Sequence, residues 1–464
     1  MRVLLLINTS PIPANDGAKM RTWSILRALA AEGHEIVLVA FAAPREEDRA
    51  SSELSRVCRR VIQVPHRLKS LSSTKEYLGR ATHLLSSAPY GVVAARSSEM
   101  SREIVALLNK KVVDVILCEQ TDLLINLPKQ VPVPLVVDFH NIDYLIIERY
   151  LRFERNPPKR LYAWLESRKL REWERRACRL ASTAFACSDH DRALLQALGP
   201  NLPMFVVPNV VDVNEYVPDG REDARKVLFQ GSMDWYPNRD AVEFFVTQIF
   251  SRIRSQVPDA RFVVAGRNPP EEFRERLSQV PGVKFTGTVP DIRAEIAGAA
   301  VCVVPLRIGS GTRLKILEAA AMAKPIVSTR LGAEGLEFRD GQEIALEDEP
   351  AAFADAVVKL LSAVPDRHRL GQAARKRVEQ NYGFPALRAS LREALNTFTM
   401  DAKLARSEGV GETLGGSRGA TESTSRHRAI DLRIGESALR QDSDGKSAAF
   451  RGGDKPHTWR SRQN

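Results

Sequence analysis

Apolar runs of strand length alternate with helical patterns along nearly the whole chain, and this alternation constrains the fold more than any other feature. The first half contains six runs with the length and apolar character of buried strands, at residues 3–7, 36–41, 113–117, 135–138, 183–187 and 205–207. Helical patterns such as residues 20–31 and 188–197 fill the gaps. Alternation of this kind predicts a parallel sheet with helices on both faces.

A second series of the same kind begins near residue 227. Its expected strands are residues 227–230, 261–265, 283–285, 301–304 and 326–328. The chain is therefore predicted to be an α/β protein with two doubly wound, Rossmann-like domains that face each other across a cleft. We expect one domain at residues 1–208 and the other at 209–400, with the last helix a candidate to cross back to the first domain.

Residues 401–464 differ in composition from the rest. They contain Gly, Ser and Thr with almost no periodic apolar positions, and 12 basic residues are interspersed with 9 acidic ones. This composition predicts a disordered tail. Because the charges are mixed and aromatic residues are nearly absent, the tail is not expected to bind nucleic acid.

Residues 309–319 carry the strongest local signal for a ligand. Gly309, Gly311 and Thr312 follow an expected strand and open a helix, and a helix N-terminus attracts anions. Arg313 and Lys315 oppose the dipole there, so they need an anion nearby. A nucleoside diphosphate fits this pattern, with its ribose hydroxyls on Glu318. The alternative is a surface helix with scattered charges, since Gly-x-Gly alone is weak evidence.

Composition narrows the cellular setting. The five cysteines form no Cys-x-x-Cys pair, so neither zinc nor a disulfide framework is expected and a reducing compartment fits. No apolar run approaches the roughly 18 residues that a transmembrane helix needs. The apolar start, residues 1–8, is too short for a signal peptide and is interpreted as the first strand. We expect a cytoplasmic protein.

Positive charge is unevenly distributed. The net charge is +11, and residues 152–179 alone hold ten Lys or Arg against four Glu. Residues 159–179 also contain Leu161, Trp164 and Trp173, so this segment is a candidate for peripheral contact with an anionic membrane. The alternative is a helix with its apolar face on the first domain and its basic face in water.

The first domain supplies candidate residues for the acceptor side. The loop at residues 9–19 contains a single glycine, Gly17, whereas a pyridine dinucleotide enzyme needs Gly-x-Gly-x-x-Gly there. His140 comes just after the expected strand 135–138, which places it at a strand's carboxyl end. Asp138 and Asp143 flank it and are candidates to orient its ring or to accept a proton. Glu119, beyond strand 113–117, is a further candidate.

Several segments resemble the GT-B fold glycosyltransferases of family 4, the glycosyl transferase group 1 set, over about residues 1–395. The matching pieces are the glycine turn at 228–238 with Gly231, the strand and glycine at 263–266 with Gly266, the base-contacting segment 283–291 with Val289, the helix with Glu318 and the strand after it, the interdomain signature 207–212, and the helix and turn at 26–35.

The resemblance implies a retaining glycosyltransferase. Its donor would be a nucleotide sugar, which is a substrate, and no cofactor is expected. The acceptor would be a glycan or a lipid-linked acceptor, and the reaction would belong to the assembly of cell-surface polysaccharide. Family members place a histidine near the transferred sugar, and His140 matches it; the alternative is a structural histidine. Gly17 opens a helix, so its backbone is a candidate to approach the donor phosphate or the transferred sugar, and the alternative is an ordinary turn glycine. Because Arg313 and Lys315 can neutralise the pyrophosphate and no Asp-x-Asp motif is present, no metal is expected.

The chain departs from the family pattern at the donor loop. Many members carry two glutamates eight positions apart, but here Ser310 replaces the first and Glu318 remains. Ser232 and Pro237 stand where many members have Arg and Lys after the glycine turn, so Arg313, Lys315 and Arg239 are candidate replacement cations. Two alternatives remain: a nucleotide-sugar epimerase on the same fold, and a non-catalytic nucleotide-sugar-binding protein.

Overall fold

A parallel seven-stranded sheet organises the first part of the chain in the computed structural model, which describes residues 1–42, 47–65 and 86–411. The strands follow the order β3-β2-β1-β4-β5-β6-β7. They are β1 Arg2–Ile7, β2 Glu35–Phe41, β3 Arg60–Val64, β4 Val115–Glu119, β5 Leu135–Phe139, β6 Thr183–Ala186 and β7 Met204–Val206. Every neighbouring pair is parallel. β3 is not among the predicted strands.

A second parallel sheet of six strands follows in the order β10-β9-β8-β11-β12-β13. Its strands are β8 Asp223–Gln230, β9 Arg261–Ala265, β10 Val283–Gly287, β11 Ala299–Val304, β12 Ile326–Ser328 and β13 Ala345–Leu346. The two sheets confirm the predicted α/β class with two doubly wound units. β13, the two-residue edge strand, was not predicted.

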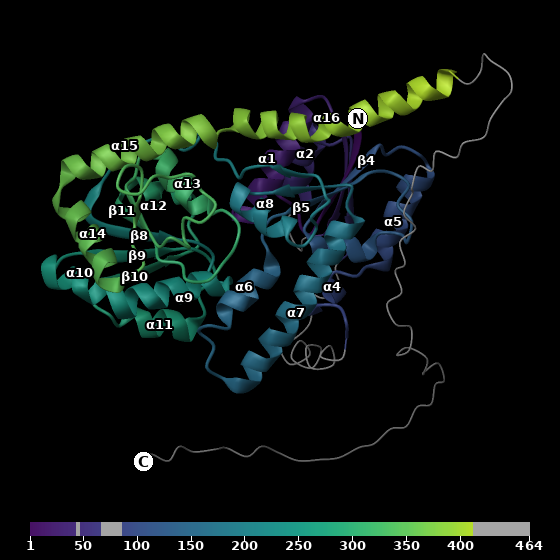
Figure 1. Cartoon of the computed structure of the whole chain (residues 1–464). Coiled ribbons are helices and arrows are strands. Elements are labelled where there is room, and N and C mark those ends of the chain that lie inside the picture. Colours follow the sequence, from purple (N-terminus) through teal and green to yellow (C-terminus); the bar gives the residue numbers. More distant parts are fainter. Residues whose placement is uncertain (43–46, 66–85, 412–464) are drawn as a thin grey trace.

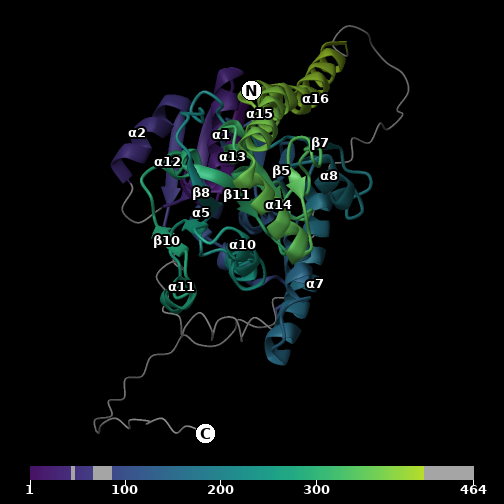
Figure 2. The same cartoon turned by 90° about the vertical axis from the view of Figure 1, so that its left-hand side faces the viewer.

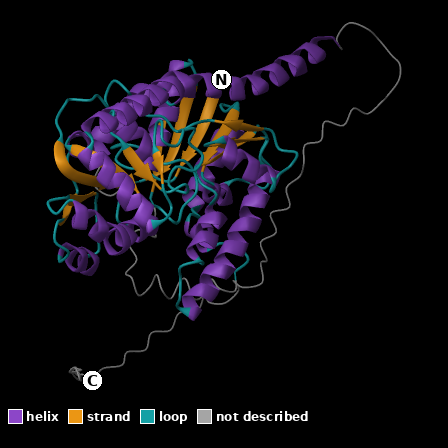
Figure 3. Cartoon of the chain, turned by 60° about the vertical axis from the view of Figure 1, so that its left-hand side comes forward, coloured by secondary structure: helices purple, strands orange, loops and turns teal. Residues whose placement is uncertain are grey.

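Helices cover both faces of the first sheet, so its strands are apolar on both sides. Figure 3 shows the strands in the interior with helices around them. Separate apolar clusters fill the two faces, one containing Leu4 and Leu6 and the other Val3, Leu5 and Ile7. The helices are α1 Gly17–Ala31, α2 Glu47–Val57, α4 Tyr90–Ala94, α5 Ser98–Asn109, η3 Thr121–Asn126, α6 Asp143–Tyr150, α7 Pro157–Leu180 and α8 Asp189–Gln196.

The second unit has a single large core that contains an aromatic group, in which Phe245 packs against Phe262 with ring centroids 4.3 Å apart. A continuous helical segment joins α9 to α10 through the π-helical turns of η4. The helices of this unit are α9 Tyr236–Phe244, η4 Phe245–Phe250, α10 Ser251–Gln256, α11 Glu271–Ser278, α12 Ile292–Ala297, α13 Leu314–Ala321, α14 Pro350–Ser362 and α15 Val364–Asn381.

The last helix, α16 Phe384–Gly411, returns to the first unit. Leu387 and Leu391 enter the same core cluster as Leu26 of α1. Arg388 and Arg392 both pair with Glu32, at 2.7 and 2.8 Å. α16 therefore fastens the two units together along one side of the molecule. It includes the first residues of the predicted tail, and residues 412–464 lie outside the described residues.

Local signals in the sequence explain where several helices begin. The Asp16 side chain accepts a hydrogen bond from the N–H of Lys19 at 3.0 Å and caps α1. Asn156 caps α7 in the same way, with prolines in the first turn. The long helix α7 projects beyond the body of the first unit (Figure 2). No helix in the described part of the chain has the length and apolar character needed to cross a membrane.

Candidate functional site

The loop between β11 and α13 lies against the carboxyl end of β5, where the two units meet. Gly311 has a left-handed backbone with φ of 72°, and a Cβ there would lie 2.6 Å from the carbonyl oxygen of His140. Only glycine therefore allows so close an approach. α13 begins at Leu314, so the positive end of its dipole and its free N–H groups lie at this junction.

Lys315 extends from the first turn of α13 to the glycine turn after β8. Its Nζ lies 2.8 Å from Asn238 Oδ1 and 4.1 Å from the centre of the Phe229 ring. A Cβ on Gly231 would lie 2.9 Å from this Nζ. Burial, assisted by the charge of Arg313, lowers the pKa of Lys315 to about 7. The Lys315 ammonium thus brings a positive charge to the glycine turn 228–238, which has no basic residue of its own.

Arg313 points elsewhere, although it stands only two positions earlier. Its Nη1 donates hydrogen bonds to the carbonyl oxygens of Ser310 and Gly311, so the side chain braces its own loop. Its Nη2 is buried and has no hydrogen-bond partner in the described part of the chain. Burial lowers the pKa of Arg313 to about 10. The two cations that the sequence places together therefore serve different neighbours.

Glu318 is buried one turn further along α13 and is held at both oxygens. The Tyr216 hydroxyl donates to Oε1 at 2.8 Å, and the Gln230 amide donates to Oε2 at 2.7 Å. Burial raises the pKa of Glu318, which these two bonds partly offset. A carboxylate accepts about four hydrogen bonds, so Glu318 retains capacity for a ligand hydroxyl. The protein itself already supplies one of the hydroxyl partners expected from the sequence.

The remaining predicted donor residues of the second unit surround the glycine turn or flank it. Gly266 lies so close to Gly231 that a Cβ would collide with the Gly231 carbonyl oxygen. Arg239 donates to the carbonyl oxygen of Met233 at 2.7 Å, so it braces the turn. Val289 is half-buried between β10 and α12.

Two predicted residues lie at the boundary between the units. Gly17 is the exposed first residue of α1, and a Cβ on it would lie 3.5 Å from Leu314 Cδ1 of α13. Thr312 accepts a hydrogen bond from Asn209 Nδ2 at 2.8 Å, which ties the glycine loop to the join between the units. Both residues therefore lie beside the start of α13.

His140, the predicted catalytic residue, belongs to a buried polar group at the end of β5. Its Nε2 lies 3.2 Å from Asp138 Oδ2 and 3.6 Å from Glu119 Oε2. Arg21 of α1 pairs with both oxygens of Asp138, at 2.9 and 2.6 Å. Both members of this ion pair are almost fully buried. The carboxylate that flanks His140 is therefore shared with a guanidinium.

The charges in this group shift one another's pKa values. Burial opposes ionisation of Asp138, but Arg21 and His140 hold its pKa well below the usual range. Burial disfavours the charged form of His140, yet Asp138 outweighs it and the pKa of His140 is raised. Burial, with the charge of Asp138, raises the pKa of Glu119 to about 7. A site at neutral pH thus contains both a proton donor and a proton acceptor.

Ser310, which replaces the usual glutamate, has a structural partner. Its Oγ accepts a hydrogen bond from the backbone N–H of Ile142 at 2.6 Å. Nearby, Arg149 of α6 donates to the Gly309 carbonyl oxygen at 2.5 Å and pairs with Glu334 at 2.6 Å. Serine at position 310 therefore helps to hold the loop of the second unit on the first.

A metal fits poorly here. Glu119, Asp138 and His140 offer three ligand atoms within 4.8 Å of one another. However, both oxygens of Asp138 already accept hydrogen bonds from the Arg21 guanidinium. A cation at this place would lie beside a buried positive charge, which opposes its binding.

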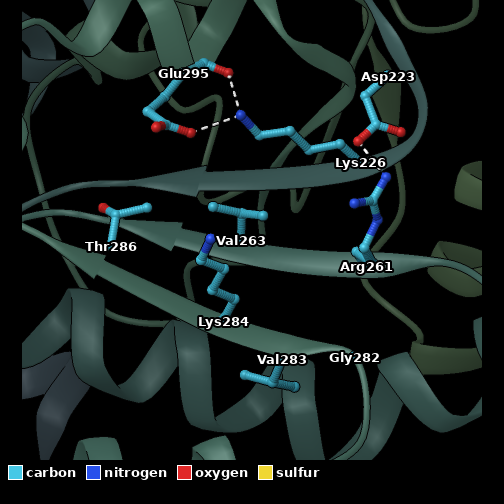
Figure 4. Close-up of a pocket in the computed structure, with 9 residues that line it drawn as sticks. All are labelled: Asp223, Lys226, Arg261, Val263, Gly282, Val283, Lys284, Thr286 and Glu295. Carbon is cyan, nitrogen blue, oxygen red and sulfur yellow. Dashed lines mark hydrogen bonds and ion pairs between the residues drawn. The ribbon is translucent and has the colours of Figure 1, made fainter.

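A separate pocket of about 330 Å³ lies over β8, β9 and β10 (Figure 4). Lys226 pairs there with Glu295 at 2.6 Å, and Arg261 pairs with Asp223. Asp223 and Arg261 begin their strands, so the pocket extends toward the amino ends of the strands, away from the glycine loop. Since two of the three cations that line it are already neutralised and the third, Lys284, is exposed to solvent, the pocket is a weaker anion site than the start of α13.

The sequence did not predict the residues that form hydrogen bonds with the predicted site residues. Arg21, Asn238, Tyr216 and Gln230 contact Asp138, Lys315 and Glu318 from elements far away in the chain. Gln230 and Asn238 fall within the glycine turn 228–238, which is a signal for their region, whereas Arg21 is one of two arginines in the helical pattern of residues 20–31 and nothing local distinguishes it. Its partner lies 117 positions away and no local pattern reveals it.

Two family models match the chain. The model described as "Glycosyl transferase 4-like domain" matches residues 16–210, and "Glycosyl transferases group 1" matches residues 224–363. The matches correspond to the two units of the fold, and the second contains the glycine turn and α13.

Individual proteins agree with these matches. An "uncharacterized 44.6 kDa protein in cps region" of Klebsiella pneumoniae is 20% identical over 82% of this chain and 96% of its own length. The phosphatidyl-myo-inositol mannosyltransferase of Mycolicibacterium smegmatis is 27% identical over 39% of this chain and 48% of its own. The Anabaena protein HepE, solved with UDP and glucose, superposes with a TM-score of 0.57 over 85% of this chain and 99% of its own, at 14% identity.

Proposed function

We propose, from the premise that this chain belongs to the glycosyl transferase group 1 family of GT-B enzymes, that it moves a sugar from a nucleotide-sugar donor to a glycan or lipid-linked acceptor in the assembly of cell-surface polysaccharide. The cps-region relative supports the polysaccharide setting, and the mannosyltransferase relative supports a lipid-linked acceptor. We propose that transfer retains the anomeric configuration and needs neither metal nor cofactor.

One observation carries the donor assignment: the Lys315 ammonium lies at the Gly231 turn, one helical turn from Glu318. The cation and the turn suit a diphosphate, while the carboxylate suits a ribose. HepE was solved with UDP, which supports a nucleoside diphosphate sugar as the donor. Because Lys315 is half-buried and has no ion-pair partner among residues 1–42, 47–65 and 86–411, a bound phosphate would supply its missing counter-charge.

The chemistry then follows from these charges. Departure of the nucleoside diphosphate builds up negative charge on its phosphates. Lys315 and the N-terminus of α13 stabilise that charge electrostatically, without rearrangement of the site. His140 lies against the glycine loop, so it borders the transferred sugar, and Asp138 with Arg21 holds the position of its ring.

A screen of nucleotide sugars tests this proposal. The true donor and its nucleoside diphosphate should raise the melting temperature, because a ligand that binds only the folded state stabilises it. Donor turnover that needs an added acceptor supports transfer. Donor turnover that releases free nucleoside diphosphate in the absence of any acceptor would indicate the epimerase instead. Binding with no turnover under any condition would indicate the non-catalytic protein that the loss of a glutamate at Ser310 suggested.

We further propose that the protruding half of α7 contacts an anionic membrane. Leu161 and Trp164 are 60% and 45% exposed there. The helix also has exposed basic residues in this half, namely Lys159, Arg160 and Arg168, and Arg152 and Arg155 are exposed in the segment before it. In the other half, Trp173 is buried and Arg175 and Arg179 pair with Glu172. The contact within residues 159–179 is therefore assigned to the protruding half.

Two matched charge reversals on α7 test this contact. Lys159→Glu with Arg160→Glu should weaken binding to phosphatidylglycerol vesicles by about 2 kcal/mol or more, since each basic residue near the surface contributes about 1 kcal/mol. Arg175→Glu with Arg179→Glu changes the net charge equally and should have little effect. Cosedimentation at low and physiological salt measures both. Equal losses in the two pairs, or no binding by the unaltered protein, would rule out the proposed surface.

A further inference from the structure

A second cation, in addition to Lys315, reaches the glycine turn 228–238. Arg267 lies two residues after β9, and its carbonyl oxygen accepts a hydrogen bond from the N–H of Met233 at 2.9 Å. The Arg267 Nε donates to Ser232 Oγ at 3.3 Å. The loop after β9 therefore lies beside the turn, and the side chain of Ser232 is small enough for the guanidinium to reach it.

The same guanidinium also contacts the first unit. Its Nη2 lies 2.8 Å from Asp16 Oδ2, and its Nη1 donates to Asn15 Oδ1 at 3.0 Å. Asp16 directly precedes Gly17, where a Cβ would lie 3.5 Å from Leu314 at the start of α13. The ion pair between Arg267 and Asp16 therefore borders both the glycine turn and the start of α13, the two places that suit the phosphates of a donor.

This ion pair is open to water, so it can exchange partners. The side chains of Arg267 and Asp16 are 29% and 26% exposed, and a further carboxylate, Asp234, lies 3.7 Å from the Arg267 Nε and is still more exposed. Such pairs contribute little to stability, unlike the buried pair of Arg21 and Asp138. A guanidinium binds two phosphate oxygens at once through parallel N–H groups. A diphosphate at the turn would therefore compete with the carboxylates for Arg267.

We propose that Arg267 binds a phosphate of the donor in exchange for Asp16, so that donor binding breaks an ion pair between the two units. This inference rests on the proposed transferase function. A diphosphate carries more negative charge than Lys315 alone can neutralise, and the guanidinium groups of Arg313 and Arg239 donate to backbone carbonyl oxygens instead. Arg267 therefore strengthens donor binding, whereas Asp16 weakens it.

Opposite effects of the two ion-pair partners test this exchange. Calorimetry with UDP, GDP and ADP first identifies the diphosphate that the unaltered protein binds, and this diphosphate and its nucleoside are then the probes. Arg267→Met should weaken diphosphate binding about tenfold or more, because a charge-assisted hydrogen bond is lost, and should leave nucleoside binding unchanged. Asp16→Asn should strengthen diphosphate binding about twofold to fivefold, because a competing exposed ion pair is removed. Asparagine also caps helices well, so α1 keeps its start.

Two further variants separate phosphate binding from loss of charge or of fold. Arg274→Met removes an exposed ion pair with Glu271 in α11 and should change neither diphosphate binding nor the melting temperature. Adding Ser232→Arg to Arg267→Met should restore part of the lost diphosphate affinity, because the new guanidinium extends from the turn itself. The melting temperatures of Arg267→Met and Asp16→Asn should stay within about 4 °C of the unaltered protein, since each breaks only a partly exposed pair.

The possible failures are distinguishable. Equal or weaker diphosphate binding by Asp16→Asn would show that the ion pair only joins the two units, and would overturn the exchange. Unchanged diphosphate binding by Arg267→Met, or an equal loss in Arg274→Met, would overturn the assignment of Arg267 to a phosphate. Failure of all three diphosphates to bind the unaltered protein would overturn the proposed function instead.

Discussion

The two sides of the junction between the units carry unbalanced charges of opposite sign. On the second unit, burial lowers the pKa of Arg313 to about 10 and that of Lys315 to about 7, so both cations are disfavoured. On the first unit, burial raises the pKa of Glu119 to about 7 and that of Asp122 to about 6, so both anions are disfavoured. Each side thus keeps charges at a cost to its own stability.

The Arg21–Asp138 pair shows what a balanced charge looks like in the same protein. Asp138 is as deeply buried as Glu119, yet its pKa falls because a guanidinium contacts both of its oxygens. The difference teaches that burial alone does not define a binding site. A charge that burial disfavours and that has no ion-pair partner among the described residues indicates where a ligand is missing, and its sign indicates the chemistry: an anion at Lys315.

The largest expected effect comes from breaking the balanced pair. Arg21→Met leaves Asp138 buried without its partner and should lower the free energy of unfolding by about 3–5 kcal/mol, as measured by urea denaturation. Arg27→Met is the control on the same helix, because its ion pair with Asp212 is partly exposed and should contribute about 1 kcal/mol or less. Adding Asp138→Asn to Arg21→Met should restore part of the loss. No difference between the two arginines would contradict the comparison.

Lys315→Met tests the unbalanced cation. Nucleoside diphosphate affinity should fall about tenfold to a hundredfold, since a charge-assisted hydrogen bond contributes about 1.5–3 kcal/mol, while affinity for the free nucleoside should stay unchanged. Calorimetry measures both ligands. The melting temperature should not fall, because a disfavoured buried cation is removed.

Arg313→Ala sharpens the same test, because Arg313 braces the loop. This variant should lose both nucleotide affinity and thermal stability, whereas Lys315→Met loses affinity alone. Lys284→Met, an exposed lysine in the separate pocket, is the control for loss of one positive charge. An equal loss of nucleoside affinity in Lys315→Met would show that Lys315 does not bind phosphate.

The two sides should also give opposite dependence of stability on pH. The pKa of Glu119 is about 7 in the folded state and about 4.5 when unfolded, so the folded state binds more protons between these values and stability falls as pH rises. The pKa of Lys315 is about 7 folded and 10.5 unfolded, so the unfolded state binds more protons above pH 7 and stability rises.

Single variants separate these two slopes. Relative to Glu119→Gln, the unaltered protein should lose up to about 1.4 kcal/mol per pH unit from pH 4.5 to 7. Relative to Lys315→Met, it should gain at a similar rate from pH 7 to 10.5. Denaturant unfolding across the pH range measures both differences. Parallel pH profiles for the three proteins would mean that neither side is electrostatically unbalanced.

The smallest effect is expected from removing the C-terminal residues. The core contacts of α16 end near Phe398, and the sequence after residue 400 has no apolar pattern able to pack. A chain that ends at residue 400 should keep its melting temperature and its nucleotide affinity. A drop of several degrees would show that the later residues stabilise one side of the junction, and the comparison would then have to include them.

The sequence predicted most of the strands and the elements that carry the donor site. β1, β2, β5, β9, β11 and β12 follow from apolar runs, because strands buried on both faces are apolar throughout. β3 was missed because its sequence, Arg-Val-Ile-Gln-Val, is only partly buried, and β13 because two residues form no pattern. Gly311 and Glu318 were found because glycine turns and buried acids in apolar helices are local signals.

Only the tertiary structure decided how the charged residues are partnered. Arg313 and Lys315 are two positions apart, yet one is at the N-cap and the other inside the helix, so their side chains reach a loop and a distant turn. Arg21 meets Asp138 across 117 positions, and Asp143 meets Glu174 only because α6 and α7 pack together. Local sequence sets backbone conformation and burial, whereas charge balance depends on which distant elements the fold brings within a few ångströms.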